Sequence, residues 1–169
     1  MNKEGVFWLC VTTAALVSIF VLLGISDGVE EQLFSSADEV HPAAEACLGG
    51  HGSIADHYHV DVAITLLGES YEVPEDVGIN DGDCSMRQLH THDASGRIHV
   101  ETLESGTQVP LGAFFDIWGL HFDESGFGDY RIDADHEFLM YLNGELVESY
   151  DQLILEDKQQ VELIYRATD

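Results

Sequence analysis

Imidazole and carboxylate side chains recur at strand spacing between residues 89 and 101, a combination typical of transition-metal sites. The stretch reads Leu-His-Thr-His-Asp-Ala-Ser-Gly-Arg-Ile-His-Val-Glu. Its Asp-Ala-Ser-Gly segment at 93–96 is typical of a turn, so we expect a hairpin with His90 opposite His99 and His92 opposite Arg97. One face of this hairpin carries the polar residues His90, His92, Arg97, His99 and Glu101.

A second alternating run, from residue 57 to residue 66, adds two more imidazoles. Its apolar residues, from Tyr58 to Leu66, fall at every second position and predict the buried face of a strand. His57 and His59 then lie on the opposite face. If this strand joins the same sheet as the hairpin, as many as five histidines project from one surface outside the core.

Several imidazoles and a carboxylate within reach of one another resemble the ligand set of zinc or copper(II), which both bind neutral imidazole nitrogen. The alternative interpretation is a set of separate polar residues, either on a solvated sheet face or buried and hydrogen-bonded. Strand register decides between them, because a slip of one residue moves one strand's histidines to the other face. The predicted metal ligands are His90, His92, His99, Glu101, His57 and His59.

A short helix is predicted to follow the histidine hairpin. In residues 111–119 the apolar side chains fall at i, i+3, i+4 and i+7, which places them on one face of a two-turn helix. Gly119 is suited to end that helix, and the apolar face is predicted to pack into the core. The acidic, glycine-containing residues 123–135 are predicted to form a loop.

The last third of the chain predicts strands. Asn143-Gly144 is the dipeptide preferred in type I′ turns, so residues 137–142 and 145–147 should form a hairpin, and 161–165 a closing strand. The predicted fold class is α+β, with a mainly antiparallel or mixed β-sheet and one short helix. A β-grasp-like arrangement, in which a mixed sheet packs on the helix, fits this order of elements.

The N-terminal part of the 169-residue chain predicts a membrane anchor. Residues 6–25 carry no charge, and at about 1.5 Å per residue they would span the roughly 30 Å hydrocarbon core. Lys3 favours a cytoplasmic N-terminus at residues 1–5, with an acidic linker at 26–56 and an extracytoplasmic β-rich domain at 57–169. A cleaved signal peptide is the alternative.

The charge balance excludes some partners. The formal net charge is −26, with 32 acidic and 6 basic residues, so the chain should repel nucleic acid and anionic lipid surfaces. Dense carboxylates favour adaptation to high salt and a salt-loving or marine archaeal source. The predicted membrane contact is therefore the N-terminal helix alone.

Two cysteines, Cys47 and Cys84, lie beyond the predicted anchor. In an oxidising compartment the simple expectation is a disulfide between them. The alternative is that Cys84, close in sequence to His90, supplies a thiolate to the metal site.

The sequences at 89–101, at 111–119 and at 141–144 (Tyr-Leu-Asn-Gly) resemble a family of uncharacterised exported or membrane-anchored proteins of archaea and some bacteria. The resemblance covers roughly residues 57 to 166. It implies an N-terminal anchor and extracytoplasmic placement, and it implies no activity and no catalytic residues.

Three functions fit these patterns. The first is a zinc- or copper-binding domain that acts as a chaperone, store or sensor at the outer membrane face. The second is a structural or interaction module of the cell envelope that contacts another envelope protein. The third is a metal-dependent hydrolase with Glu101 or Asp93 as general base, which is less favoured because the His-Glu-x-x-His and Gly-x-Ser-x-Gly motifs are absent.

Overall fold

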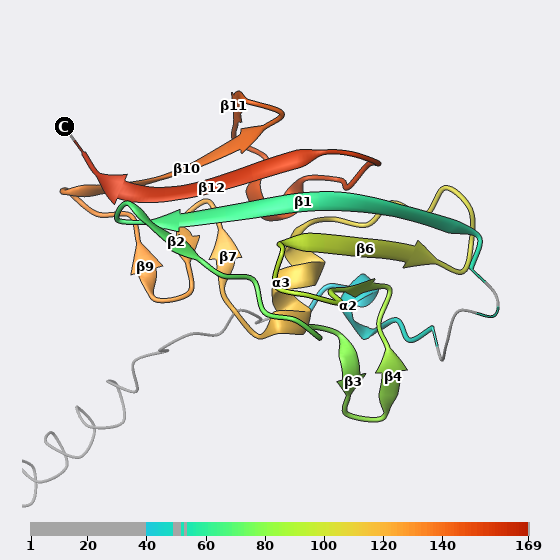
Figure 1. Cartoon of the computed structure of the whole chain (residues 1–169). Helices are drawn as coiled ribbons and strands as arrows, with labels where there is room; N and C mark the ends of the chain where they lie inside the picture. Colours follow the sequence, from blue (N-terminus) through green and yellow to red (C-terminus); the bar gives the residue numbers. More distant parts are fainter. Residues whose placement is uncertain (1–39, 49–51, 53, 169) are drawn as a thin grey trace, which may run out of the picture. The chain divides into compact units, whose positions relative to one another are not determined.

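The computed structural model describes residues 40–48, 52 and 54–168 (Figure 1). The predicted transmembrane helix at 6–25 and most of the predicted linker lie outside the described residues. Within the described part of the chain, no helix has the length and apolar character needed to cross a membrane.

One sheet organises the domain. Its strands are β1 (Asp56–Leu66), β2 (Glu69–Tyr71), β5 (Leu89–His90), β6 (Arg97–Thr102), β10 (His136–Leu142), β11 (Glu145–Val147) and β12 (Gln160–Ala167). They form a seven-stranded sheet in the order β11-β10-β12-β1-β6-β5, with β2 paired to one end of β1. The β1 and β12 strands are parallel and the other neighbours are antiparallel. The predicted α+β class with a mixed sheet is confirmed.

The remaining described elements are short: α2 (Pro42–Glu45), β3 (Ile79–Asp81), β4 (Cys84–Met86), α3 (Gly112–Trp118), β7 (Phe122–Asp123), β8 (Gly126–Phe127), β9 (Tyr130–Arg131) and the 3-10 turn η2 (Tyr150–Gln152). The segment predicted as a loop at 123–135 therefore contributes to a small three-stranded sheet. Gly126 permits this, because a Cβ there would overlap the carbonyl oxygen of Tyr130 on the neighbouring strand.

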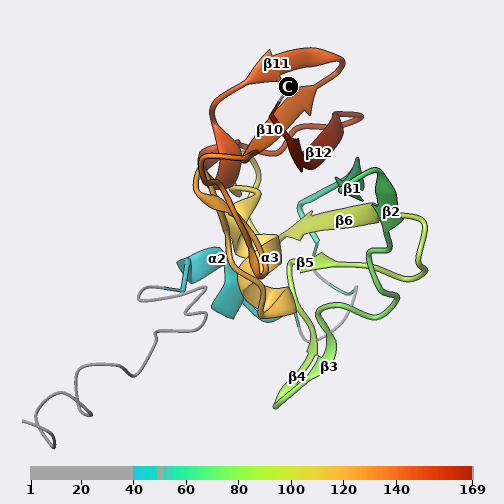
Figure 2. The ribbon, with the colours of Figure 1, turned by 90° about the vertical axis from the view of Figure 1, so that its left-hand side faces the viewer.

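The predicted helix is confirmed as α3, which ends at Gly119 with a φ of 75°. The N–H of Gly119 donates to the carbonyls of Phe115 and Asp116, which satisfies acceptors that the helix leaves open. Phe114 and Phe115 are 0% and 1% exposed. Figures 1 and 2 show α3 against one side of the sheet, so the core lies between them.

The core face of β1, β5 and β6 is apolar. Its buried residues include Val60, Val62, Leu89, Ile98 and Val100. Burial of each such side chain contributes about 1.5–3 kcal/mol, so this face fixes the register of all three strands. Because side chains alternate along a strand, the residues between these apolar positions must point to the opposite face.

Part of the predicted linker belongs to the folded domain. Ala44 in α2 is 4% exposed, and the N–H of His41 donates to Asp116 at 2.9 Å. Cys47 and Cys84 form a disulfide, as predicted, so Cys84 is not a thiolate ligand. A helix of four residues is too short to produce a periodic apolar pattern, which is why the sequence reads as a linker there.

Candidate metal centre

Strand register gathers the predicted ligands on β6 and its two neighbours. His99 of β6 is paired with His59 of β1 on one side and with His90 of β5 on the other. One step along the ladder, Glu101 is paired with His57. The second histidine strand therefore joins the same sheet as the hairpin, in the register that places all these side chains on the face away from the core.

The hairpin is shorter than the sequence predicts. Strand β5 ends at His90, so the expected pairing of His92 with Arg97 is not formed, and the partner of Arg97 is Asp61 of β1, on the other side of β6. The Arg97 guanidinium donates to both carboxylate oxygens of Asp61, at 2.8 and 3.2 Å. His92 still reaches the cluster, with its ring centroid 4.8 Å from that of His90 and 4.6 Å from that of His99.

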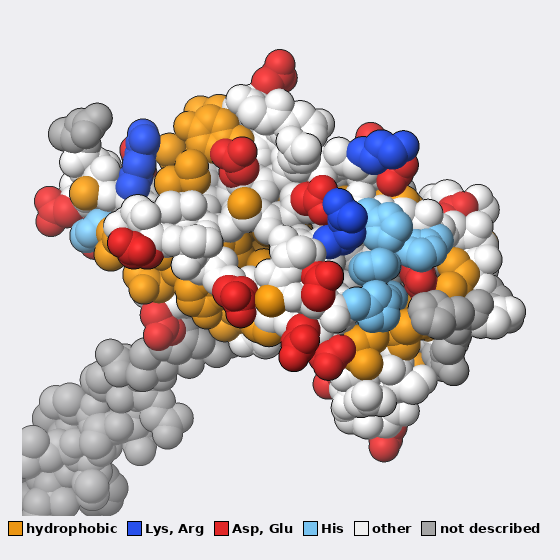
Figure 3. Space-filling model, in the orientation of Figure 1, with side chains coloured by type: hydrophobic (Ala, Val, Ile, Leu, Met, Phe, Trp, Pro, Cys, Tyr) orange, Lys and Arg blue, Asp and Glu red, His pale blue; other side chains and the backbone are white. Residues whose placement is uncertain are grey.

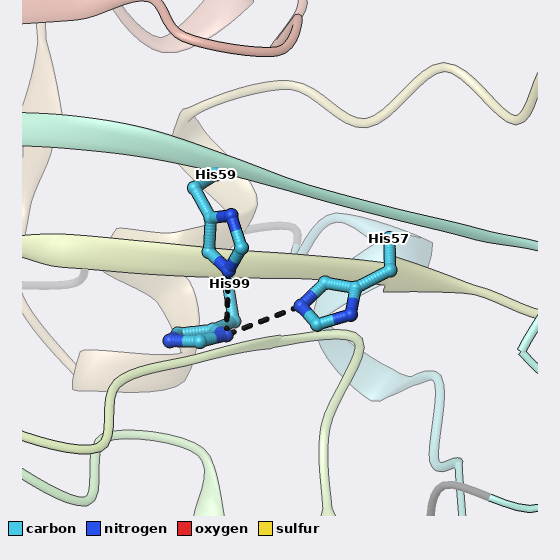
Figure 4. Close-up of side chains that lie close together, drawn as sticks. All are labelled: His57, His59 and His99. Carbon is cyan, nitrogen blue, oxygen red and sulfur yellow. Dashed lines mark hydrogen bonds between the residues drawn. The ribbon is translucent and has the colours of Figure 1, made fainter.

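The imidazoles form one patch on the surface (Figure 3), and Figure 4 shows three of them turned toward one another. The Nε2 atoms of His59 and His57 lie 3.1 and 3.3 Å from the same atom, Nδ1 of His99. An imidazole nitrogen carries either one lone pair or one proton, so Nδ1 cannot make a full hydrogen bond to both partners. Three nitrogens thus converge on a common point, as the ligands of a cation do.

A carboxylate lies beside this point. Glu101 is 0% exposed, and its Oε1 is 3.5 Å from Nε2 of His57. Burial of a carboxylate is costly unless a cation or several donors compensate it. Glu101 therefore places a carboxylate, a candidate oxygen ligand, beside His57.

These separations fit a tetrahedral ion. Bonds of about 2.0–2.1 Å to nitrogen and oxygen place neighbouring tetrahedral ligands about 3.3–3.4 Å apart. His59 and His57 lie 3.1 and 3.3 Å from His99, and Glu101 lies 3.5 Å from His57, measured between the nearest ligand atoms. The three histidines could therefore hold a metal ion, with the Glu101 carboxylate next to His57.

A second group shares His99. The ligand atoms of His90, His92 and His99 lie within 4.8 Å of one another, as do those of His57, His59 and His99. His90 is 0% exposed, and its Nδ1 donates to the carbonyl of Arg87 at 3.1 Å. This contact places the ring's lone pair on Nε2, and it is the outer hydrogen bond typical of a metal-binding histidine.

The rings in the middle of the cluster favour the neutral form. Burial, followed by the neighbouring imidazoles of His59 and His92, lowers the pKa of His99 to about 4. Burial and then His57 also lower the pKa of His59. Both rings therefore stay neutral at physiological pH. A neutral imidazole can bind a metal ion without first losing a proton.

All six predicted ligand residues lie in this neighbourhood, and the structure divides the five histidines into two triads. Sequence reasoning missed the Arg87 carbonyl, because a backbone acceptor leaves no signal in residue types. Two other described histidines make separate local contacts: His121 with Asp123 and Ser125, and His136 with Asp133.

Comparison with models of known families, with curated proteins and with solved structures gives no match to this chain. The resemblance inferred from the sequence motifs therefore stays a prediction.

Proposed function

We propose that this protein is a single-pass, membrane-anchored extracytoplasmic domain that binds a transition-metal ion, zinc or copper, through its histidine-rich sheet face. The observation that carries the proposal is the convergence of Nε2 of His57 and Nε2 of His59 on Nδ1 of His99, at 3.3 and 3.1 Å. Independent surface histidines have no reason to share one acceptor. An ion between the three nitrogens would satisfy all of them.

Zinc is the better fit for this first triad. A square-planar copper(II) site would need at least one pair of ligands about 4 Å apart, on opposite sides of the ion. The separations of 3.1 and 3.3 Å within the triad are those of neighbouring tetrahedral ligands. Zinc has no geometric preference against that arrangement.

The ligand set supports binding rather than catalysis. A catalytic zinc site keeps one coordination position for water or substrate, whereas a structural site is closed by four protein ligands. The three imidazoles form the triad, and the buried Glu101 carboxylate, 3.5 Å from Nε2 of His57, is the protein group that would move toward the ion to close the fourth position. A hydrolase with Glu101 as general base would require this carboxylate to reach a bound water, which its full burial opposes.

The setting of the domain is consistent with a role in handling metal outside the cytoplasm. A disulfide joins Cys47 to Cys84, and such bonds persist in oxidising compartments. The net charge of −26 would raise the local concentration of cations and speed their capture. The uncharged residues 6–25 would hold the domain at the membrane, where a chaperone, store or sensor of metal would act.

We assign the domain to a β-grasp-like arrangement. The strand order β11-β10-β12-β1-β6, with the first and last long strands parallel at the centre and α3 between β6 and β10, supports this assignment. In this arrangement the helix covers one sheet face and leaves the other open, and the open face is the one that carries the histidines.

Zinc affinity of variants tests the proposal. The full-length chain, purified in mild detergent, is titrated with zinc against a chromophoric chelator. We expect His59→Gln to weaken zinc binding at the tightest site more than about 100-fold. Loss of a residue that only hydrogen-bonds to a metal ligand already lowers metal affinity, typically by about 10–100-fold. The matched control is His136→Gln. The ring of His136 contacts Asp133, and its strand, β10, is separated from β1 by β12.

Equal losses in His59→Gln and His136→Gln would mean that zinc binds through scattered surface charge, and the proposal would fail. Absence of tight binding in the unaltered protein would also overturn it. In either case the structural or interaction module of the envelope becomes the better account of this surface.

A further inference from the structure

The two histidine triads approach His99 from opposite sides. Strand β6 lies between β1 and β5 in the sheet. His57 and His59 come from β1, whereas His90 comes from β5 and His92 from the loop that follows it. His99, on the central strand, is the only histidine in both triads among the described residues.

The ring of His99 has a nitrogen for each side. Its Nδ1 is the atom approached by His57 and His59, and Figure 4 shows the second ring nitrogen on the opposite side of the ring. The rings of His90 and His92 lie 5.3 and 4.6 Å from that of His99, measured between centroids. One imidazole can therefore face two separate ligand groups.

We propose that His99 bridges two metal ions. Its Nδ1 binds the ion held by His57 and His59, and its Nε2 binds a second ion, copper(II) or zinc, held by His90 and His92. This inference rests on the proposed function and adds the second site. When both nitrogens bind an ion, the one N–H proton of the neutral ring goes to solvent, and the ring bridges as imidazolate.

His90 is already prepared for this role. Its ring is fully buried, and its Nδ1–H donates to the carbonyl of Arg87, which places the lone pair on Nε2, the atom that would bind the second ion. His92 is exposed and gives the second ion a route from solvent. The pairing of a fixed ligand with an accessible one suits a site that takes up metal from outside.

Charge near the bridge reduces the repulsion between two divalent ions. The imidazolate carries one negative charge between them, and the buried Glu101 carboxylate lies 3.5 Å from Nε2 of His57. The net charge of −26 on the chain adds a favourable long-range field for a second cation.

Copper(II) titration followed by electron paramagnetic resonance tests the bridge on the full-length protein in mild detergent. The first equivalent should give the signal of an isolated copper(II) ion. The second should bind and reduce the integrated signal, because an imidazolate bridge couples two copper(II) spins antiparallel. His92→Gln should bind one ion and keep the uncoupled signal, while His136→Gln should behave as the unaltered protein does.

The outcomes separate the two proposals. One tight ion in the unaltered protein, with no effect of His92→Gln, overturns the bridge and leaves the proposed function standing. Two tight ions whose signals simply add show two unconnected sites and also overturn the bridge. Absence of any tight ion overturns both proposals. His92 is the residue to replace because it is exposed. Replacement of the buried His90 would also change the stability of the fold, so a loss of metal binding would have two causes.

Discussion

The two faces of β1, β5 and β6 follow the same alternation of side chains but hold them in different ways. Toward α3 the strands present Val60, Ile98 and Leu89, each 0% exposed. These side chains are held by hydrophobic packing, which is non-directional. On the opposite face they present imidazoles whose nitrogens converge at 3.1 and 3.3 Å. The apolar face therefore sets the register, and that register places the histidines.

This comparison separates stability from function. Changes on the core face should destabilise the fold with or without metal. Changes at the exposed or half-buried histidines, His57, His59 and His92, should leave the metal-free fold nearly intact and weaken metal binding.

The largest effect is expected in the core. Phe114→Ala removes a fully buried ring from α3, and the free energy of unfolding should fall by about 3–5 kcal/mol. Urea denaturation followed by circular dichroism measures it, with and without zinc. A loss below about 1 kcal/mol would mean that α3 does not hold the sheet as described.

The disulfide gives the next effect. Cys47 and Cys84 are 37 residues apart, so replacing both by serine should cost about 4 kcal/mol through the greater freedom of the unfolded chain. Zinc affinity, measured below the unfolding transition, should stay within a few-fold because the ligands of the first triad lie on β1 and β6. Loss of the tight site in this folded variant would show that the bridge, rather than the sheet, positions the ligands.

The sequence predicts the shared face of the candidate ligands well because alternation alone determines which face a strand residue occupies. The turn at 93–96 and the apolar run of β1 together predict that His57, His59, His90 and His99 share a surface, and the register confirms it. The helix is predicted because its four apolar positions match one helical face. In these segments one local pattern and the tertiary structure agree.

Other features depend on contacts that no local pattern encodes. The role of residues 42–47 comes from the packing of Ala44 and from the disulfide. Arg97 is paired with Asp61 because β1 lies along the edge of β6 opposite to β5, and because β5 ends at His90, before it could place His92 opposite Arg97. The histidines divide into two triads because β6 lies between β1 and β5. The pairing of β5 with β6 in the hairpin does not by itself specify where β1 lies.

Zinc itself should stabilise the fold through the histidine face. At a free zinc concentration about 100 times the dissociation constant, the free energy of unfolding should rise by about 2.7 kcal/mol. Thermal or urea unfolding of the unaltered protein and of His59→Gln measures the difference. Equal stabilisation of both proteins would show that the ion is held elsewhere.

Acid should weaken the metal-free protein through His99. Its pKa is lowered to about 4 in the folded state from an ordinary value of 6.5, so between these values only the unfolded chain binds the proton. Stability is therefore retained above pH 6.5 and falls as the pH drops toward 4. Urea unfolding near pH 7 and about pH 5 should show a smaller acid loss for His99→Gln than for the unaltered protein. An identical pH dependence of the two would contradict this account.

The smallest effect is expected beside the site. Arg97 places a positive charge near His99 and is one cause of its lowered pKa. Arg97→Gln should raise zinc affinity a few-fold by removing that repulsion, with a change in unfolding free energy below about 1 kcal/mol because its ion pair with Asp61 is exposed. Chelator competition measures the affinity, and a decrease would show that Arg97 supports the ligands.

X-ray absorption at the zinc edge, with one equivalent of zinc on the full-length protein, tests the central claim most directly. The account predicts four nitrogen or oxygen ligands at about 2.0–2.1 Å, with the outer-shell scattering of three imidazoles. The His59→Gln variant should lose one imidazole from that pattern. A shell of six oxygens without imidazole scattering would contradict the proposal that the converging rings of His57, His59 and His99 are a metal site.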